Sequence, residues 1–154
     1  MSTEIRFYHM EHSTLESALP ALLNKAVAQG NIVVQSTSKQ NVEALNTHLW
    51  TYKPESFLPH GSQKDGNAEQ QPIWLTDKEE NPNEANILIL THGATNENLK
   101  DYKLCCEMLN GNDPEAVTAA RERWKAYKEE GYAITYWQQG QQGWEMKASE
   151  NKAD

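Results

Sequence analysis

The alternation of short apolar runs with helical patterns constrains the fold of this 154-residue chain more than any other feature. Residues 31–36 (NIVVQS) form a short apolar run typical of a strand that is buried on both faces of a parallel sheet, and residues 86–90 (NILIL) give the strongest strand prediction in the chain. Further strands are expected at residues 4–10, 72–75 and 132–137. Strands that alternate with helices predict an α/β protein with three layers, α/β/α, around a mainly parallel sheet.

The first helix is expected between the strand at residues 4–10 and Gly30, which ends its apolar pattern. Ser17 is the preferred N-cap, because this start leaves Pro20 in the first turn, where its missing N–H costs nothing. The alternative is a start at Ser13 with a kink at Pro20.

The strongest helix signal covers residues 114–130, with Asp113 as N-cap, Pro114 in the first position and Gly131 just past the end. On a helical wheel, one apolar arc is bordered by cations. The arc contains Ala116, Val117, Ala120, Trp124 and Tyr127, and the cations are Arg121, Lys125 and Lys128. This pattern fits either a solvated face whose long side chains cover the edge of the core, or a site for an anionic partner with an apolar anchor.

A segment rich in proline and aromatic residues, residues 49–60 (LWTYKPESFLPH), cannot form the interior of a helix. Its large apolar side chains, Trp50, Phe57 and Leu58, need a surface that covers them. One interpretation is that they fold back onto the protein's own core. The other is that they form a docking patch for a partner, because aromatic residues commonly anchor interfaces.

The charge balance argues against a general role in coating DNA. The chain has 22 acidic and 14 basic residues, and a formal net charge of −8. Such a charge opposes nonspecific attraction to a phosphate backbone. No run approaches the roughly 20 apolar residues of a membrane span, and the N-terminal residues do not resemble a signal peptide. The adjacent Cys105 and Cys106 would point to opposite faces of a strand, so neither a disulfide nor a metal site is expected, and a cytoplasmic location fits.

The sequence offers no motif for a cofactor. Neither a glycine-rich dinucleotide fingerprint nor a phosphate loop follows any expected strand, so the predicted α/β fold lacks the motifs that bind phosphates, and nucleotide binding is not supported. His9 and His12 lack further ligands at metal spacing. Thr91-His92-Gly93 follows the strand at residues 86–90, where α/β proteins commonly bind ligands. An alternative hypothesis is therefore a small hydrolase or transferase that acts there, although the sequence pairs no nucleophile with His92.

Two motifs make the chain resemble the chi subunit of bacterial DNA polymerase III. The first is Leu49-Trp50 followed by residues 54–60 (PESFLPH), and the second is residues 121–128 (RERWKAYK) with Gly131 after it. Weaker matches extend the resemblance over about residues 4–137, which we expect to form one domain. Residues 138–154 are polar and low in complexity, and a disordered tail is expected there.

The resemblance implies a replication accessory subunit without catalytic activity. It also implies a fold that resembles nucleotide-binding α/β folds but lacks a phosphate loop. Members of this family pair one-to-one with the psi subunit, which tethers them to the clamp loader, and bind the acidic C-terminal tail of single-stranded DNA-binding protein. The implied psi-binding residues are Trp50, Phe57, Leu58 and Pro59, and the implied tail-binding residues are Arg121, Trp124, Lys125 and Lys128. Trp124 stands where a tyrosine is familiar, and Asn110-Gly111 replaces an expected apolar pocket wall. Tight direct binding to nucleic acid is not expected.

Overall fold

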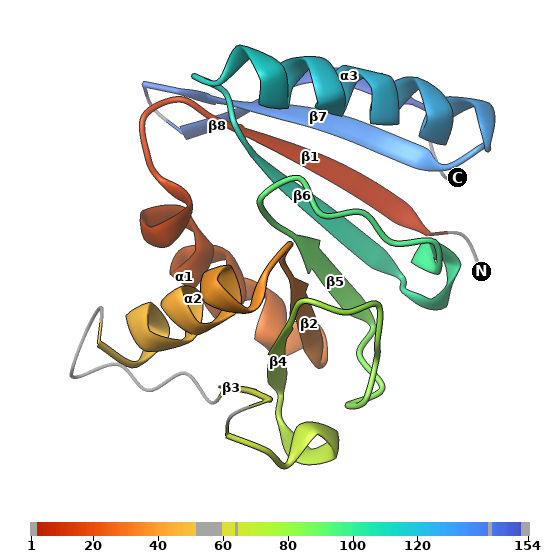
Figure 1. Cartoon of the computed structure of the whole chain (residues 1–154). Helices are drawn as coiled ribbons and strands as arrows, with labels where there is room; N and C mark the ends of the chain where they lie inside the picture. Colours follow the sequence, from red (N-terminus) through yellow and green to blue (C-terminus); the bar gives the residue numbers. More distant parts are fainter. Residues whose placement is uncertain (1–2, 52–59, 64, 142, 152–154) are drawn as a thin grey trace.

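The computed structural model describes residues 3–51, 60–63, 65–141 and 143–151, and in these ranges eight strands form one sheet in the order β3-β4-β2-β5-β6-β1-β7-β8 (Figure 1). The strands are β1 (Glu4–Met10), β2 (Ile32–Gln35), β3 (Gly61–Ser62), β4 (Ile73–Thr76), β5 (Ile87–Leu90), β6 (Leu104–Asn110), β7 (Ala133–Gly140) and β8 (Gly143–Glu150). All neighbouring pairs are parallel except β7 and β8, which are antiparallel. The predicted α/β class with a mainly parallel sheet is confirmed.

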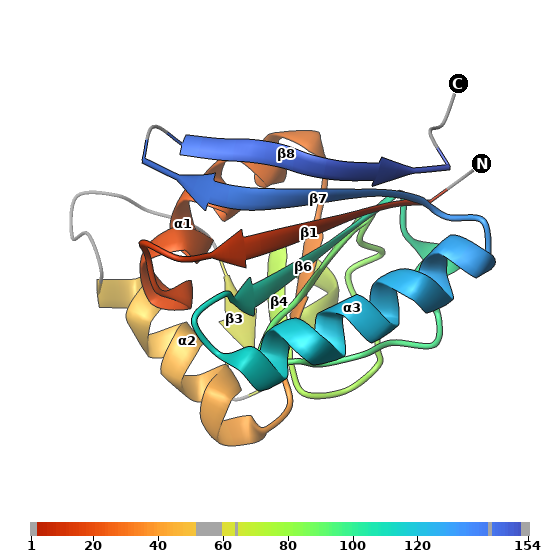
Figure 2. The same cartoon turned by 90° about the horizontal axis from the view of Figure 1, so that it is seen from above.

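Helices cover both faces of the sheet, as the three-layer prediction requires. They are α1 (Leu15–Ala26), α2 (Lys39–Thr51) and α3 (Pro114–Glu129), with short 3-10 turns η1 (Val27–Gln29), η2 (Ala68–Gln70) and η3 (Leu99–Asp101). Figures 1 and 2 show α1 and α2 on one side of the sheet and α3 on the other. None of the helices in the described ranges has the length and apolar character that crossing a membrane demands.

The side chains of the sheet divide into two cores, one on each face. On β6, Cys106 lies in the core under α1 and α2, while Cys105 lies in the core under α3. Both are buried and free, and the expectation that they point to opposite faces of the strand is confirmed. Every residue of β2 and β5 is buried, because these central strands are covered on both faces.

The helix α1 begins earlier than the preferred prediction. Its N-cap is Thr14, whose hydroxyl accepts from the Ser17 backbone N–H at 3.3 Å, while the Ser17 hydroxyl accepts from the Thr14 N–H at 3.1 Å. Pro20 therefore lies inside the helix and cannot donate to the carbonyl of Glu16. His48 of α2 donates to that carbonyl instead, at 2.6 Å. The preference for Ser17 as N-cap was wrong, because a neighbouring helix satisfies the group that the proline leaves open.

A strand occupies most of the segment that the sequence analysis expects to be disordered. The strand β7 continues to Gly140, and β8 pairs with it from Gly143 to Glu150. Gly143 takes a φ of 128°, a backbone conformation that favours glycine, where the hairpin turns. Gln139 anchors the end of β7, because its side-chain oxygen accepts from the backbone N–H groups of residues 11–13. The polar composition of this segment predicted disorder, but pairing with β7 makes β8 a strand.

Candidate functional site

The helix α3 carries the candidate site, and its ends follow from local chemistry. The carboxylate of Asp113 accepts from the backbone N–H of Glu115 at 3.1 Å, and Pro114 occupies the first turn. Gly131 follows the helix with a φ of 88°. The predicted helix of residues 114–130 is confirmed to within one residue. In the chain, α3 follows β6 and precedes β7, and it packs on the face of the sheet opposite α1 and α2 (Figure 2).

The apolar arc of α3 faces the sheet, as the helical wheel predicts. Ala120 and Tyr127 are buried, while Val117 and Trp124 are partly buried against the same core. The ring of Trp124 makes edge contacts with Phe7 and Tyr136, at centroid distances of 5.7 and 5.9 Å. Trp124 therefore belongs partly to the protein's own core and presents only part of its ring to solvent.

The cations beside this arc are exposed, but they are not equivalent. The side chains of Arg121 and Lys125 form no ion pair or hydrogen bond with the described residues. Lys128, in contrast, lies 3.3 Å from the carboxylate of Glu150 on β8. The structure thus brings Arg121, Trp124 and Lys125 together on one stretch of α3 with two uncommitted positive charges.

An ion pair that the sequence patterns did not predict connects α3 to the sheet. The guanidinium of Arg123 donates from Nε and from a terminal nitrogen to one oxygen of Glu107, on β6. Glu107 is 2% exposed, and its other oxygen has no hydrogen-bond partner among the described residues. Burial raises the pKa of Glu107, and Arg123 opposes that shift. An acidic residue in the apolar run of β6 was the available signal, but it could not identify the partner cation.

The structure explains why Gly111 stands where an apolar wall residue was expected. A Cβ atom at this position would collide with the ring of His9 and approach the carbonyl oxygen of Met10 to 2.7 Å. The N–H of Gly111 donates to that same carbonyl, at 2.7 Å. Close packing of the β6–α3 turn on the end of β1 therefore requires glycine.

The implied psi-binding residues are only partly described. Trp50 lies near the end of α2 with 47% of its surface exposed, and its ring centroid is 4.4 Å from that of His60. Phe57, Leu58 and Pro59 lie outside the described residues. The exposure of Trp50 argues against the interpretation in which this residue fills the protein's own core.

The alternative site at His92 has a hydroxyl beside the imidazole, as in many hydrolases, but this hydroxyl does not face the neighbouring cavity. Its Nδ1 lies 2.6 Å from the hydroxyl of Ser36, and burial lowers the pKa of His92. Arg123 and His92 both line a cavity of about 720 Å³ near the carboxyl ends of β1 and β6. Ser36, however, is 2% exposed and is not among the residues that line this cavity. Because the hydroxyl of Ser36 is not accessible to a substrate in this cavity, we interpret its contact with His92 as a structural hydrogen bond.

His9, which was considered as a metal ligand, forms contacts with other side chains. His9 Nδ1 lies 2.6 Å from the hydroxyl of Tyr136, and His9 Nε2 lies 3.1 Å from a carboxylate oxygen of Glu11. Within the described part of the chain, no group of three or more His, Cys, Asp or Glu side chains is arranged to hold a metal ion.

The fold and the site together define an α/β protein whose exposed cations beside an aromatic helix face are suited to binding a partner. Comparison with known proteins identifies its family. The sequence model of the DNA polymerase III chi subunit, HolC, matches residues 1–135. A protein of Rickettsia prowazekii (strain Madrid E), named "Probable DNA polymerase III subunit chi", is 34% identical over 88 residues.

The chain belongs to the DNA polymerase III chi subunit family, whose role is accessory to DNA replication. The resemblance that the two sequence motifs predicted is thereby confirmed. The match to the Rickettsia protein covers 56% of this chain and 53% of that relative, so the chain spans about half the length of the curated relative. The strand β8 begins at Gly143, after the family match ends.

Proposed function

We propose that this protein links the clamp loader of the DNA polymerase III holoenzyme to single-stranded DNA-binding protein during DNA replication. In this role the psi subunit pairs with the segment that contains Trp50, Phe57, Leu58 and Pro59, and so connects the chain to the clamp loader. The acidic C-terminal tail of single-stranded DNA-binding protein binds the exposed face of α3. The protein acts in the cytoplasm as an adaptor, without a cofactor and without a reaction of its own.

The observation that carries this proposal is the pair of uncommitted cations beside a half-buried aromatic ring. A tail that is rich in aspartate and ends in an apolar residue needs positive charge next to apolar surface. Arg121 and Lys125 supply the charge, and the accessible part of Trp124 supplies the apolar surface. On a chain with a net charge of −8, an exposed cationic stretch of this kind gives an acidic peptide a defined place to bind.

Calorimetry with a peptide that copies the tail tests the proposed site. Arg121→Glu and Lys125→Glu should each weaken binding by roughly 1.5–3 kcal/mol, the scale of hydrogen bonds to charged groups. Co-purification with psi should remain unchanged in both variants, because Trp50 lies on α2, on the opposite side of the sheet from α3 (Figure 1).

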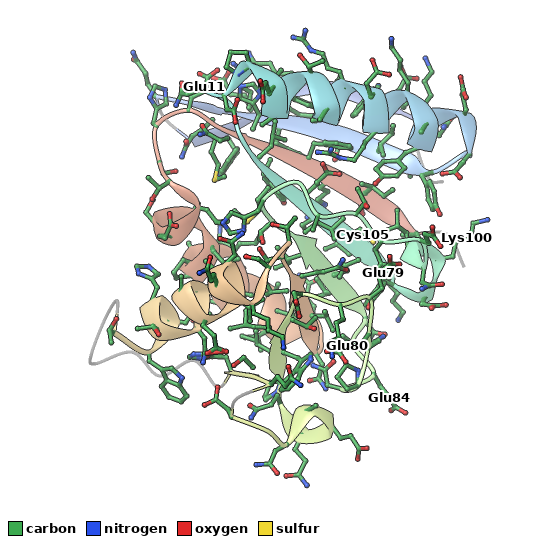
Figure 3. The ribbon with its side chains drawn as sticks, viewed as in Figure 1. Glu11, Glu79, Glu80, Glu84, Lys100 and Cys105 are labelled. Carbon is green, nitrogen blue, oxygen red and sulfur yellow. The ribbon has the colours of Figure 1, made fainter. Side chains whose placement is uncertain are left out.

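Lys100→Glu provides the matched control. Lys100 lies in η3, outside the helix α3, and its exposed side chain points outward (Figure 3). The same charge reversal there should leave peptide affinity unchanged, apart from a small loss that salt removes. Equal losses in the Lys100 and Lys125 variants would reduce the effect to net charge, and undiminished binding in both α3 variants would refute the site.

A further inference from the structure

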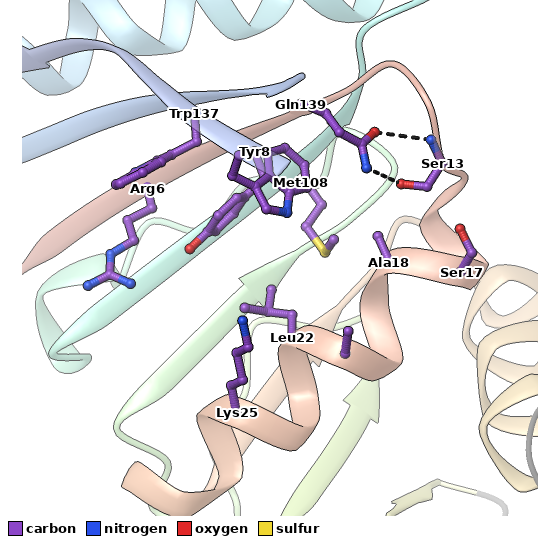
Figure 4. Close-up of a pocket in the computed structure, with 12 residues that line it drawn as sticks. Arg6, Tyr8, Ser13, Ser17, Ala18, Leu22, Lys25, Met108, Trp137 and Gln139 are labelled. Atoms are coloured by element: carbon purple, nitrogen blue, oxygen red, sulfur yellow. Dashed lines mark hydrogen bonds between the residues drawn. The ribbon is translucent and has the colours of Figure 1, made fainter. Parts of the chain in front are cut away.

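A second apolar surface with uncommitted charge lies on the opposite side of the sheet from α3. It is a cleft of about 420 Å³ between α1 and the sheet face formed by β1, β7 and β8 (Figure 4). Aromatic rings from three strands, those of Tyr8, Trp137 and Trp144, line its sheet side, and the small side chains of α1, such as Ala18, line the other. Tyr8 and Trp144 meet edge to face, with centroids 5.2 Å apart.

The charge in this cleft is positive, although the protein is acidic. Two of its twelve lining residues are cations, Arg6 and Lys25, and none is acidic. Arg6 donates to the carboxylate of Glu4 at 2.7 Å, whereas Lys25 forms no ion pair or side-chain hydrogen bond with any residue in the described ranges. Figure 4 shows both cations toward one end of the cleft. An anionic group at that end would meet a charge that nothing else in the described structure neutralises.

The polar groups at the other end are already engaged. The side-chain nitrogen of Gln139 donates to the Ser13 hydroxyl at 2.6 Å, and its oxygen accepts three backbone N–H groups. Ser17 completes the N-terminal cap of α1. At the cationic end, where Trp137 lies near Arg6 (Figure 4), its indole N–H donates to the hydroxyl of Thr135 at 2.9 Å. The cleft can therefore recognise a ligand by contact with its aromatic rings and by the positive charge at one end. It offers few free hydrogen-bond donors for the polar groups of a ligand.

We propose that this cleft binds an acidic peptide segment of a partner protein. A large apolar or aromatic side chain of the peptide lies against Tyr8, Trp137 and Trp144, and a neighbouring carboxylate meets Lys25 and Arg6. Charge complementarity favours this occupant over the alternatives. Two cations are too few for the several phosphates that a nucleic-acid strand presents, and a second copy of the chain would bring another net charge of −8.

The site depends on a part of the chain that the family match does not include. The match ends at residue 135, and both Trp137 and Trp144 lie beyond it. The cleft is also independent of the proposed site on α3, because the two lie on opposite faces of the sheet (Figure 2). The proposal therefore does not rest on binding of the single-stranded DNA-binding protein tail, and it can fail or succeed separately.

Selection from a library of short random peptides tests the proposal. The target is the full chain with Arg121→Glu and Lys125→Glu, so that the α3 face is removed as a competing site for acidic peptides. The enriched peptides should combine Trp, Phe or Leu with adjacent Asp or Glu. Trp144→Ala and Lys25→Glu should each lower the affinity of a synthetic copy about tenfold, since each removes one of the two features that the cleft recognises. Trp144→Phe should restore much of the affinity, and Lys100→Glu should have no effect.

Four outcomes would overturn the proposal. The first is the absence of enriched peptides, and the second is enrichment of peptides without acidic residues. The third is an affinity that Trp144→Ala leaves unchanged, in a variant whose circular dichroism spectrum is also unchanged. The fourth is an affinity that Lys25→Glu leaves unchanged. Two control measurements exclude the other occupants. Binding of oligothymidylate at moderate salt that is lost with Trp144→Ala would assign the cleft to nucleic acid. Dimerisation in sedimentation that is lost with the same variant would assign it to a second copy.

Discussion

Glu107 is the residue that most directly determines how α3 presents its surface. It lies in the apolar strand β6, and Arg123 reaches down from α3 to bind it. Residues two positions apart on a helix point about 200° away from each other. With Arg123 directed at the sheet, Arg121 and Lys125 must therefore point away from it. The ion pair between Arg123 and Glu107 thus orients the two cations of the proposed tail-binding site.

Replacing only Arg123 should lower the free energy of unfolding more than replacing both residues of the pair. Arg123→Met leaves Glu107 buried without a counter-charge, and we expect a loss of about 3–5 kcal/mol in the free energy of unfolding at neutral pH. The double variant with Glu107→Gln should recover a large part of that loss, because no uncompensated charge is left. Urea denaturation measures both. Equal stability of the single and double variants would show that Arg123 contributes through packing alone.

The pH dependence of the single variant provides a second measurement. Burial raises the pKa of Glu107 above its ordinary value of 4.5, so the folded state holds this proton more tightly than the unfolded state does. The stability that comes from binding this proton is fully present below pH 4.5 and is lost as the pH rises through the pKa of Glu107 in the folded state. Without Arg123 that pKa rises further. The deficit of Arg123→Met relative to the unmodified protein should therefore shrink on acidification from pH 7, as urea titrations at several pH values would show.

Phe57 is the residue by which the psi-binding proposal can be tested most simply. Phe57→Ala should abolish pairing with psi and leave the fold intact, since an aromatic residue that anchors an interface contributes on the order of 2 kcal/mol or more. Co-purification measures the pairing, and circular dichroism measures the fold. Unfolding of this variant would place Phe57 in the protein's own core. Trp50→Ala is a useful companion, because 47% of Trp50 is exposed near the end of α2.

At the scale of elements, β8 and α3 are linked by the ion pair between Lys128 and Glu150. This contact engages one of the four residues assigned to tail binding, so Lys128 should contribute less than Lys125. Glu150→Gln frees Lys128 and should strengthen binding of the tail peptide by about 0.2–1 kcal/mol, the range for exposed ion pairs. Calorimetry at low salt measures the change. A gain that persists in the double variant with Lys128→Gln would show that Lys128 does not carry it.

The elements that the sequence predicts well are those whose ends are determined locally. Asp113, Pro114 and Gly131 bound α3 without help from the rest of the chain, and its helical wheel sorts buried from exposed positions correctly. The start of α1 is harder, because the carbonyl that Pro20 leaves open is satisfied by His48 from another helix. The strand β8 is harder still, since it depends on pairing with β7 rather than on its own polar composition.

At the scale of the whole molecule, periodicity predicts the layers but not the order of the strands. Apolar runs identify β2 and β5 as central, and the structure places them side by side. Nothing in the sequence indicates that β1 lies between β6 and β7, far from β2. That order brings Phe7 of β1 beneath Trp124 of α3. Half-burial of the tryptophan in the proposed site is therefore a consequence of topology, which local patterns do not contain.

The distribution of charge over the whole molecule bears on how the protein reaches DNA. The net charge of −8 provides no general attraction to phosphates. Of the three cations assigned to the face of α3, Lys128 is already paired with Glu150. Two free cations cannot neutralise the several phosphates that nonspecific binding to single strands normally requires. We therefore expect the protein to act on single-stranded DNA only through a protein partner.

Recruitment assays at physiological salt test this expectation. The protein should bind single-stranded DNA coated with intact single-stranded DNA-binding protein, and neither naked DNA nor DNA coated with a form that lacks its acidic C-terminus. Salt should weaken the recruited complex only modestly, because a few charge contacts and one apolar anchor share the binding energy. Lys125→Glu should reduce recruitment in parallel with its effect on the isolated tail peptide. Tight binding to naked single strands, with a steep dependence on salt, would make residues 121–128 a phosphate-binding site and the protein a DNA-binding module rather than an adaptor.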